Sequence, residues 1–210
     1  YIDNFNADDW IVEGEDYGYM YMNPVHTIIL PEGLQEIGDF ALTNARHLEQ
    51  ITIPAGVTRI GESAFEECRS LESVTFAGKA LREIDDWAFY NCHTLKNITI
   101  PEGVTTIGNA VFKGCTALES ITLPNTITDI GGSAFSGCTS LKSITIPEGV
   151  TIIFPETFKD CSSLKSVTLP NGLTHIRSGA FTGSAIEELT IPESVTCMDK
   201  SAFYKCASLR

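Results

Sequence analysis

The stretch LESITLPNTITDIGGSAFSGCTS, Leu118–Ser140, is followed directly by LKSITIPEGVTIIFPETFKDCSS, Leu141–Ser163. The two stretches align position by position, and the same pattern extends in both directions along the chain. Equivalent positions start at Val25, Leu48, Leu71, Leu95, Leu118, Leu141, Leu164, Ile186 and Leu209. The starts are nearly evenly spaced, so the stretch from Val25 to Leu209 holds eight units. A repeat of about 23 residues indicates a solenoid, in which each unit packs on its neighbours.

The first half of each unit predicts a strand that ends at a proline. Residues 120–123 alternate polar and apolar side chains, which is typical of a strand with one buried face. Proline cannot donate to a β-ladder, so we expect the strand to stop where it occurs. Seven of the eight units carry it: Pro31, Pro54, Pro101, Pro124, Pro147, Pro170 and Pro192. By this register Ile98 lies inside and Thr99 outside.

The second half of each unit predicts a bend and a compact corner. Ile127 and Ile130 favour a short bending segment, and Ala134-Phe135 with a cysteine three residues later predicts a single helical turn. One unit has too little buried surface to fold alone, whereas stacked units place parallel strands ~4.8 Å apart around one core. In the unit from Leu95 we expect these residues to be buried together: Ile98, Ile100, Val104, Ile107, Phe112 and Cys115.

The unit reads L-x-x-I-x-I-P-x-x-V-x-x-I-G-x-x-A-F-x-x-C-x-x, and this pattern resembles the BspA-like leucine-rich repeats. The resemblance covers residues 25–209. It implies an α/β repeat solenoid, a strand-rich leucine-rich-repeat horseshoe with a concave parallel β-sheet and short convex elements. It also implies a secreted or cell-surface protein that adheres to host matrix proteins or to other cells. The solenoid domain is then residues 25–210, with eight repeats and the start of a ninth, so we expect the natural chain to continue.

Local departures from the pattern and the first residues of the chain lie outside this regularity. An extra residue falls near Gly78–Lys79, where Ala77-Gly78 replaces the proline, and one residue is missing near Ser184–Ala185. Residues 1–24 do not fit the repeat and carry six acids, no base and six aromatic side chains. Because an open solenoid end exposes core and strand edges, we expect residues 1–24 to form an N-terminal cap. An aromatic patch that stacks on sugar rings is the alternative.

Charge and hydropathy exclude several classes of partner. The chain has 27 acidic and 14 basic residues among 210, a formal net charge of −13. A surface of that sign repels nucleic acid and anionic lipid. No apolar run approaches the ~18 residues of a membrane-spanning helix, so we expect no membrane span in this segment. Mixed charges on the sheet surface favour a monomer.

Six of the seven cysteines occupy one repeat position, where the two remaining units carry Ala45 and Ser184. Such substitutes indicate a small, buried side chain whose thiol donates weakly to the backbone, although the spacing between coils would also permit disulfides. No C-x-x-C pair suggests zinc. Cys197 stands at a different position and is expected to be more exposed and more reactive than the six in the column: Cys68, Cys92, Cys115, Cys138, Cys161 and Cys206.

Two columns of side chains are predicted to lie on the open face of the sheet. One is a threonine column, and the other, three positions earlier, carries mixed charges. Threonine packs well on a pleated surface, and mixed charges aid solubility, so both columns have a purely structural explanation. Because concave solenoid faces are extended binding surfaces, we nevertheless expect ligand contacts at Lys96, Glu119, Lys142, Lys165, Thr99, Thr122, Thr145 and Thr168.

The sequence predicts no enzyme, cofactor or metal. The four histidines occupy different repeat positions, and no nucleophile, zinc-protease or phosphate-loop motif occurs. The spacing Asn4, Asn6, Asp8 and Glu15 imitates a calcium loop but has Asp9 where the turn needs glycine. We therefore expect a non-enzymatic protein-binding module. A passive spacer that displays another domain of a longer surface protein is the alternative, because the face lacks the Trp, Tyr and Arg that anchor hot spots.

Overall fold

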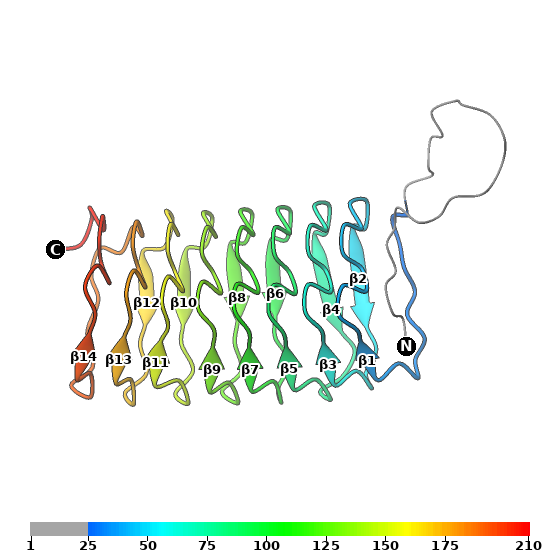
Figure 1. The fold of residues 1–210 in the computed structure, drawn as a ribbon, viewed down its shortest axis with the longest axis horizontal. Helices are drawn as coiled ribbons and strands as arrows, with labels where there is room; N and C mark the ends of the chain where they lie inside the picture. The colour runs from blue at the N-terminus through cyan, green and yellow to red at the C-terminus, as the bar shows by residue number, and fades with distance from the viewer. Residues whose placement is uncertain (1–24) are drawn as a thin grey trace, which may run out of the picture.

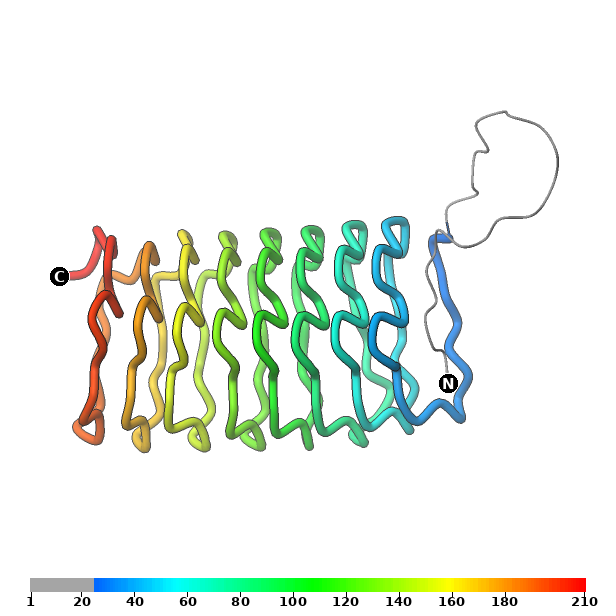
Figure 2. The backbone as a smooth tube through the Cα atoms, in the orientation of Figure 1, coloured from blue at the N-terminus to red at the C-terminus, as the bar shows by residue number. Residues whose placement is uncertain are grey.

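The computed structural model describes residues 25–210. In this range every repeat forms one coil, and the coils stack side by side in a nearly straight row (Figures 1 and 2). The predicted N-terminal cap and the calcium-like spacing fall in residues 1–24 and lie outside the described residues. The repeat solenoid is therefore confirmed, whereas the expected horseshoe curvature is not.

Two columns of parallel strands run along the solenoid. The longer strands are β2 (Gln50–Ile53), β4 (Ser73–Phe76), β6 (Asn97–Thr99), β8 (Ser120–Thr122), β10 (Ser143–Thr145) and β12 (Ser166–Thr168). The second column consists of two-residue strands: β1 (Glu36–Ile37), β3 (Arg59–Ile60), β5 (Glu83–Ile84), β7 (Thr106–Ile107), β9 (Asp129–Ile130), β11 (Ile152–Ile153), β13 (His175–Ile176) and β14 (Cys197–Met198). Figure 1 shows the two columns as separate rows of arrows.

Strand register places identical repeat positions beside one another. In the pair β6–β8, Ile98 lies opposite Ile121 and Thr99 opposite Thr122. The Ile98 residue is 4% exposed and Thr99 is exposed, so the predicted inside–outside assignment is confirmed. All six residues predicted to be buried together, from Ile98 to Cys115, belong to one hydrophobic cluster that runs through every coil. A one-residue slip would have inverted the faces.

The expected single helical turn is wrong, because residues 25–210 contain no α-helix. In the corner after Gly131, Ser133 (φ 56°) and Gly137 (φ 75°) adopt the left-handed conformation, which interrupts any right-handed helix. The N–H of Phe135 donates across to the carbonyl of Thr157 in the next coil at 2.9 Å, as do its neighbours at alternate positions. Backbone groups that a helix would pair internally thus join adjacent coils. The class is a strand-rich parallel β-solenoid instead of α/β.

Phenylalanine rings at these corners form a continuous stack through the core. Successive ring centroids are 5.1 to 5.6 Å apart and the ring planes differ by at most 9°. The stack consists of Phe65, Phe89, Phe112, Phe135, Phe158, Phe181 and Phe203. Six of these side chains are fully buried, and Phe203 is partly buried in the last coil. The rings thus follow one another from the second coil to the last.

The column cysteines pack beside this stack as free thiols. All seven cysteines of the chain are free, and the five column members from Cys68 to Cys161 are fully buried. Each buried Sγ donates to a backbone carbonyl of the preceding coil at 3.1 to 3.2 Å. Burial raises the pKa of Cys68, Cys115 and Cys161 to about 12. The prediction of small, buried, unpaired side chains is confirmed for these five; Cys206 is half-buried.

Candidate functional site

The outward side of the longer strands is here called the threonine face. Its central column is a row of exposed hydroxyl side chains: Thr52, Thr75, Thr99, Thr122, Thr145, Thr168 and Thr190. The three- and four-residue strands hold the first six threonines in register, because each strand begins exposed, buried, exposed; Thr190 lies in no strand. Neighbouring polar side chains bond along the row, as Ser120 Oγ does to Asn97 Oδ1 at 2.6 Å. The face is thus polar, with the same repeat positions aligned from coil to coil.

Beside the threonines lies the charged column, whose members pair between adjacent coils. Lys96 Nζ lies 3.3 Å from Glu72 Oε2, and Lys142 Nζ lies 2.5 Å from Glu119 Oε2. Lys165 Nζ lies 2.9 Å from Glu187 Oε1. The hydrogen bond from Lys142 lowers the pKa of Glu119 below its usual range. All three lysines predicted as ligand contacts are therefore already engaged within the chain, although their side chains are 57 to 69% exposed.

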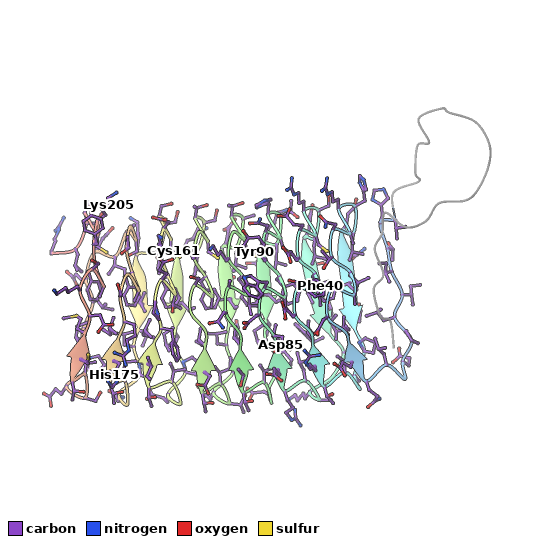
Figure 3. All side chains as sticks on the ribbon, viewed as in Figure 1. Phe40, Asp85, Tyr90, Cys161, His175 and Lys205 are labelled. Atoms are coloured by element: carbon purple, nitrogen blue, oxygen red, sulfur yellow. The ribbon has the colours of Figure 1, made fainter. Side chains whose placement is uncertain are left out.

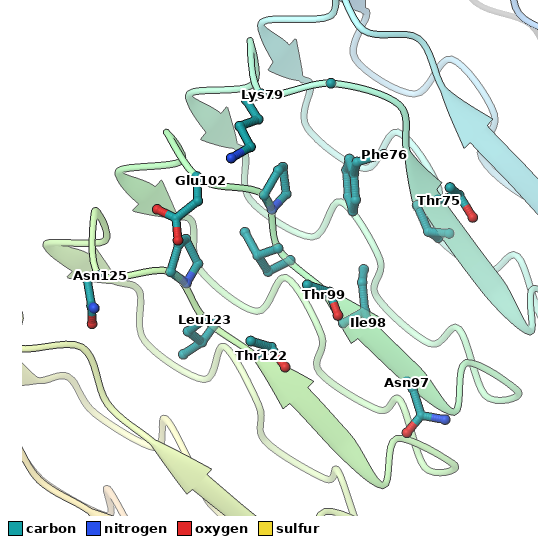
Figure 4. A pocket seen from close by; sticks show the side chains of 15 residues that line it. Thr75, Phe76, Lys79, Asn97, Ile98, Thr99, Glu102, Thr122, Leu123 and Asn125 are labelled. Atoms are coloured by element: carbon teal, nitrogen blue, oxygen red, sulfur yellow. The ribbon is translucent and has the colours of Figure 1, made fainter.

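The regular face is broken by a hollow of about 620 Å³ between β4 and β8. Thr75, Thr99 and Thr122 supply its hydroxyl groups, and its apolar lining includes Phe76, Ile98, Ile100 and Leu123. Figure 4 shows Lys79, Glu102 and Asn125 at one end of this hollow. An apolar recess with polar groups around it is the kind of feature that anchors a bound side chain.

This hollow lies beside the irregular third repeat. The step from Leu71 to Leu95 is one residue longer than the steps on either side, and Ala77-Gly78 replaces the strand-ending proline. β4 pairs with β2, and β6 pairs with β8, but a ladder joins neither β4 to β6 nor β8 to β10, so the ladders alone do not mark the irregular step. Along the charged column the backbone N–H of Glu119 donates to Lys96 at 2.8 Å, whereas within residues 25–210 Lys96 makes no such bond to Glu72. The missing backbone bond, the extra residue and the hollow thus coincide.

A second hollow of about 620 Å³ lies at the other irregular step. Lys165, Thr168, Leu169, Glu187 and Thr190 are among its lining residues. The step from Leu164 to Ile186 is one residue shorter than its neighbours, and within the described range the backbone ladder of the charged column is missing between Lys165 and Glu187 as well. A smaller hollow of about 250 Å³ lies over the first coils, between Thr27 and Ala77.

The predicted contact residues therefore fall into two groups. Thr99 and Thr122 line the first hollow, and Lys165 and Thr168 line the second. Lys96, Glu119, Lys142 and Thr145 line neither and belong to the regular part of the face. Sequence reasoning missed Phe76, Leu123 and Lys79, which contribute to the first hollow. The signal that could have found them was the longer third repeat itself, because an inserted residue must bulge out of a stack.

In the described part of the chain, side chains of the types that hold metals or act in catalysis do not lie close together. Within residues 25–210 no three His, Cys, Asp or Glu side chains are placed to hold a metal ion. The Nδ1 of His93 lies 2.9 Å from the carbonyl oxygen of Gly114, and the Nδ1 of His175 lies 2.8 Å from Thr174 Oγ1. No helix in that range is long and apolar enough to cross a bilayer.

Cys197 differs from the column cysteines, as the sequence predicts. It is half-buried in β14, with its Sγ 3.6 Å from Asp199 Oδ1 and 4.0 Å from Arg177 Nη1. The five column thiols from Cys68 to Cys161 have no exposed surface. Its greater exposure is confirmed against these five thiols but not against Cys206, which is half-buried as well; its reactivity stays a prediction.

Comparison with known proteins gives consistent matches. Residues 3–101 and 82–210 match the family described as BspA type leucine rich repeat region, in six copies. Among solved structures, the leucine rich repeat protein TpLRR of T. pallidum is 32% identical, with a TM-score of 0.68 over 73% of this chain and 74% of that one. Among curated proteins, no sequence matches this chain.

Two further solved structures share the architecture. A leucine-rich repeat protein from Bacteroides ovatus is 28% identical, with a TM-score of 0.63 over 84% of this chain and 58% of that one. The pneumococcal vaccine antigen PcpA is 25% identical, with a TM-score of 0.55 over 84% of this chain and 53% of that one. This chain thus spans little more than half the length of these two proteins.

Proposed function

Because the chain belongs to the BspA-type leucine-rich repeat family, we propose that it is an extracellular or cell-surface module that binds another protein through its threonine face. The proposed function involves no catalysis. Extracellular placement is supported by the likeness to PcpA, which is described as a vaccine antigen. The proposed contacts are the predicted residues of the face, centred on Thr99 and Thr122, together with the side chains around the first hollow.

The observation that carries the proposal is the hollow between β4 and β8. Protein interfaces draw most of their affinity from a few buried anchors, surrounded by contacts that exclude water. The hollow of about 620 Å³ offers such an anchor a partly buried Phe76 and Leu123 next to three threonine hydroxyl groups. The paired lysines on either side would then act as a polar rim, because their charges are already balanced by Glu72 and Glu119.

The proposal is tested by blocking the hollow with a bulky charge. Binding of the chain to an array of collagen, fibronectin, laminin and fibrinogen would be measured by biolayer interferometry. Thr99→Arg and Thr122→Arg should each weaken binding at least tenfold, because an arginine fills the recess. Thr105→Arg is the matched control, since Thr105 is also exposed but lies directly before β7, off the threonine face.

A second set of variants separates the hollow from the charged column. Lys142→Glu with Lys165→Glu breaks two ion pairs, whereas Glu119→Lys with Lys142→Glu reverses one pair and keeps it intact. Charges at the rim of an interface mainly affect the association rate and its salt dependence. Both double variants should therefore lose affinity, but less affinity than Thr99→Arg loses. If all variants bind like the unmodified chain, the threonine face is not the contact surface. If the unmodified chain binds no protein on the array, a spacer is the better account.

A further inference from the structure

The chain contains one asparagine that is followed by glycine, at Asn171-Gly172. The pair forms the exposed turn between β12 and β13, where the N–H of Leu173 donates to the carbonyl of Pro170 at 3.1 Å. The strand that follows contains His175, which Figure 3 labels in the C-terminal half of the solenoid. Asn171 and Gly172 are therefore the two central residues of a β-turn, with a complete coil on either side.

The side-chain amide of Asn171 is not held by any neighbour in the described residues 25–210. Most asparagines in that range bond through the side-chain amide to another side chain: Asn44, Asn91, Asn97 and Asn109. Within the same range, the amides of Asn125 and Asn171 make no hydrogen bond, and both residues are exposed. An unbonded amide in an exposed turn is free to rotate towards the backbone of the next residue.

The backbone nitrogen that follows Asn171 is unhindered. Gly172 carries no Cβ, and the atom nearest to the place that a Cβ would take is 3.9 Å away. Within residues 25–210 the N–H of Gly172 donates to no acceptor. Glycine also permits backbone angles that other residues avoid, so the turn can adjust as the two groups approach. The side-chain carbon Cγ of Asn171 can therefore reach the nitrogen of Gly172.

We propose that Asn171 is a modification site, at which the folded chain converts its own asparagine to aspartate and isoaspartate. The nitrogen of Gly172 attacks Cγ of Asn171, so that a C–N bond forms and the bond from Cγ to Nδ2 breaks. The amide nitrogen leaves as ammonia, together with the proton of the Gly172 N–H. Water then adds to either carbonyl carbon of the cyclic imide and breaks its bond to the Gly172 nitrogen, which regains a proton. One opening gives aspartate and the other gives isoaspartate.

The reaction changes contacts with both neighbouring coils. The N–H of Asn171 donates to Glu148 Oε2 at 3.2 Å, and Ser194 Oγ lies 2.7 Å from the carbonyl oxygen of Asn171 and 2.6 Å from that of Leu173. Isoaspartate lengthens the backbone between these contacts. Either product adds a carboxylate between Glu148 and Glu193, which hold the same turn position in the adjacent coils, and like charges on neighbouring rungs repel. Because Asn171 lines the second hollow, one neutral group of that hollow becomes acidic.

Asn125 is a matched control inside the same chain. The pair Asn125-Thr126 occupies the equivalent turn two coils earlier, where the N–H of Ile127 donates to the carbonyl of Pro124 at 3.2 Å. Both residues of the pair are exposed, and Figure 4 shows Asn125 at the first hollow. The two turns differ in the residue that follows asparagine, because threonine has a branched Cβ that hinders the approach of Cγ to the backbone nitrogen and glycine has none.

The test follows both asparagines in the folded chain over time. The protein would be incubated at neutral and at mildly alkaline pH and digested briefly with trypsin, with an unincubated sample as the correction for conversion during digestion. The tryptic peptides 166–177 and 114–142 each contain one asparagine, and mass spectrometry quantifies the acid form of each. Asn171 should convert roughly tenfold faster than Asn125 or more, because Gly172 lacks a Cβ. The rate should rise with pH, and an isoaspartate-specific methyltransferase should label peptide 166–177.

Two variants exchange the following residue between the two turns. Gly172→Ala should slow the conversion of Asn171 severalfold and keep the fold, because an added Cβ has room there. Thr126→Gly should accelerate the conversion of Asn125, because it removes the branched Cβ from the equivalent turn. Circular dichroism would establish that both variants are folded.

Several results would overturn the proposal. Equal rates for Asn171 and Asn125 would show that the glycine turn confers no reactivity. If Asn171 stayed intact in the folded chain but converted in a synthetic peptide of residues 166–177, the fold would hold its amide away from the nitrogen of Gly172. Aspartate without isoaspartate would exclude a cyclic imide. An unchanged rate in Gly172→Ala would show that access to the Gly172 nitrogen does not control the conversion.

Discussion

The Sγ of Cys115 donates a hydrogen bond to the carbonyl oxygen of Phe89 in the preceding coil, over 3.2 Å. The same bond recurs between the column cysteines and residues of the Phe column along the stack, so a small donor at this position helps to tie each coil to the one before it. Neutral thiols suffice for this role, and burial keeps them neutral.

We expect stability to fall with rising pH because of these thiols. The pKa of Cys115 is raised by burial to about 12, from 9.0 in the unfolded chain. A raised folded-state pKa means that the stabilisation is fully present below pH 9 and is lost as pH rises towards about 12. The free energy of unfolding would be measured with urea, in reductant, at pH 8 and pH 10. Between these pH values it should fall less for Cys115→Ser than for the unmodified chain, by up to about 1.4 kcal/mol per pH unit. If the free energy of unfolding fell equally with pH for Cys115→Ser and for the unmodified chain, Cys115 would not be a buried neutral thiol.

Thiol counting should separate exposed from buried cysteines. In denaturant without reductant all seven cysteines should react with a thiol reagent, because all are free. In the folded protein Cys197 and Cys206 should react before the other five thiols, since these two are half-buried while the five have no exposed surface. Cys197→Ser should remove one thiol from this fast phase and leave the slow phase unchanged. Recovery of five or fewer thiols in denaturant would show disulfides and refute the assignment.

Two glycines that both have room for a methyl group should respond oppositely to alanine. Gly137 has φ +75°, and its nearest neighbour to an added Cβ is 3.6 Å away, so Gly137→Ala should cost about 1–2 kcal/mol through backbone strain alone. Gly172 lacks a left-handed φ, and its nearest neighbour is 3.9 Å away, so Gly172→Ala should be neutral or stabilising by up to about 1 kcal/mol. The comparison is made by urea unfolding followed by circular dichroism. If Gly137→Ala and Gly172→Ala changed the free energy of unfolding equally, the left-handed backbone conformation at Gly137 would be contradicted.

The phenylalanine stack should tolerate a change of shape better than a loss of volume. Phe135→Ala should reduce the free energy of unfolding by about 3–5 kcal/mol, because it leaves a cavity between Phe112 and Phe158. Phe135→Leu should cost less than about 1.5 kcal/mol, since Leu42 is buried at this position in the first coil. Thermal and urea unfolding would measure both. Similar losses for the two variants would mean that ring stacking, and not filled volume, holds the coils.

Much of this architecture follows from the repeat, and the exceptions have physical causes. The alternation around Ile98 and Thr99 predicts which side is buried, because the period of a strand is two. The Ala134-Phe135 motif misleads, since apolar spacing alone does not reveal the left-handed residues at Ser133 and Gly137 that turn the backbone outward. The hollow beside Phe76 depends on how an inserted residue relaxes against the next coil, which the order of residues does not state.

The most direct test of the central claim, protein binding through the threonine face, is lysine footprinting of the complex. The chain would be acetylated with and without the matrix protein that it binds, and modification quantified by mass spectrometry. Lys96, Lys142 and Lys165 are exposed on the face, whereas Lys113 and Lys159 lie in corner segments and serve as internal controls. The account predicts protection of the first three and unchanged modification of the two controls. Protection of Lys113 and Lys159 with unchanged Lys96, Lys142 and Lys165 would contradict it.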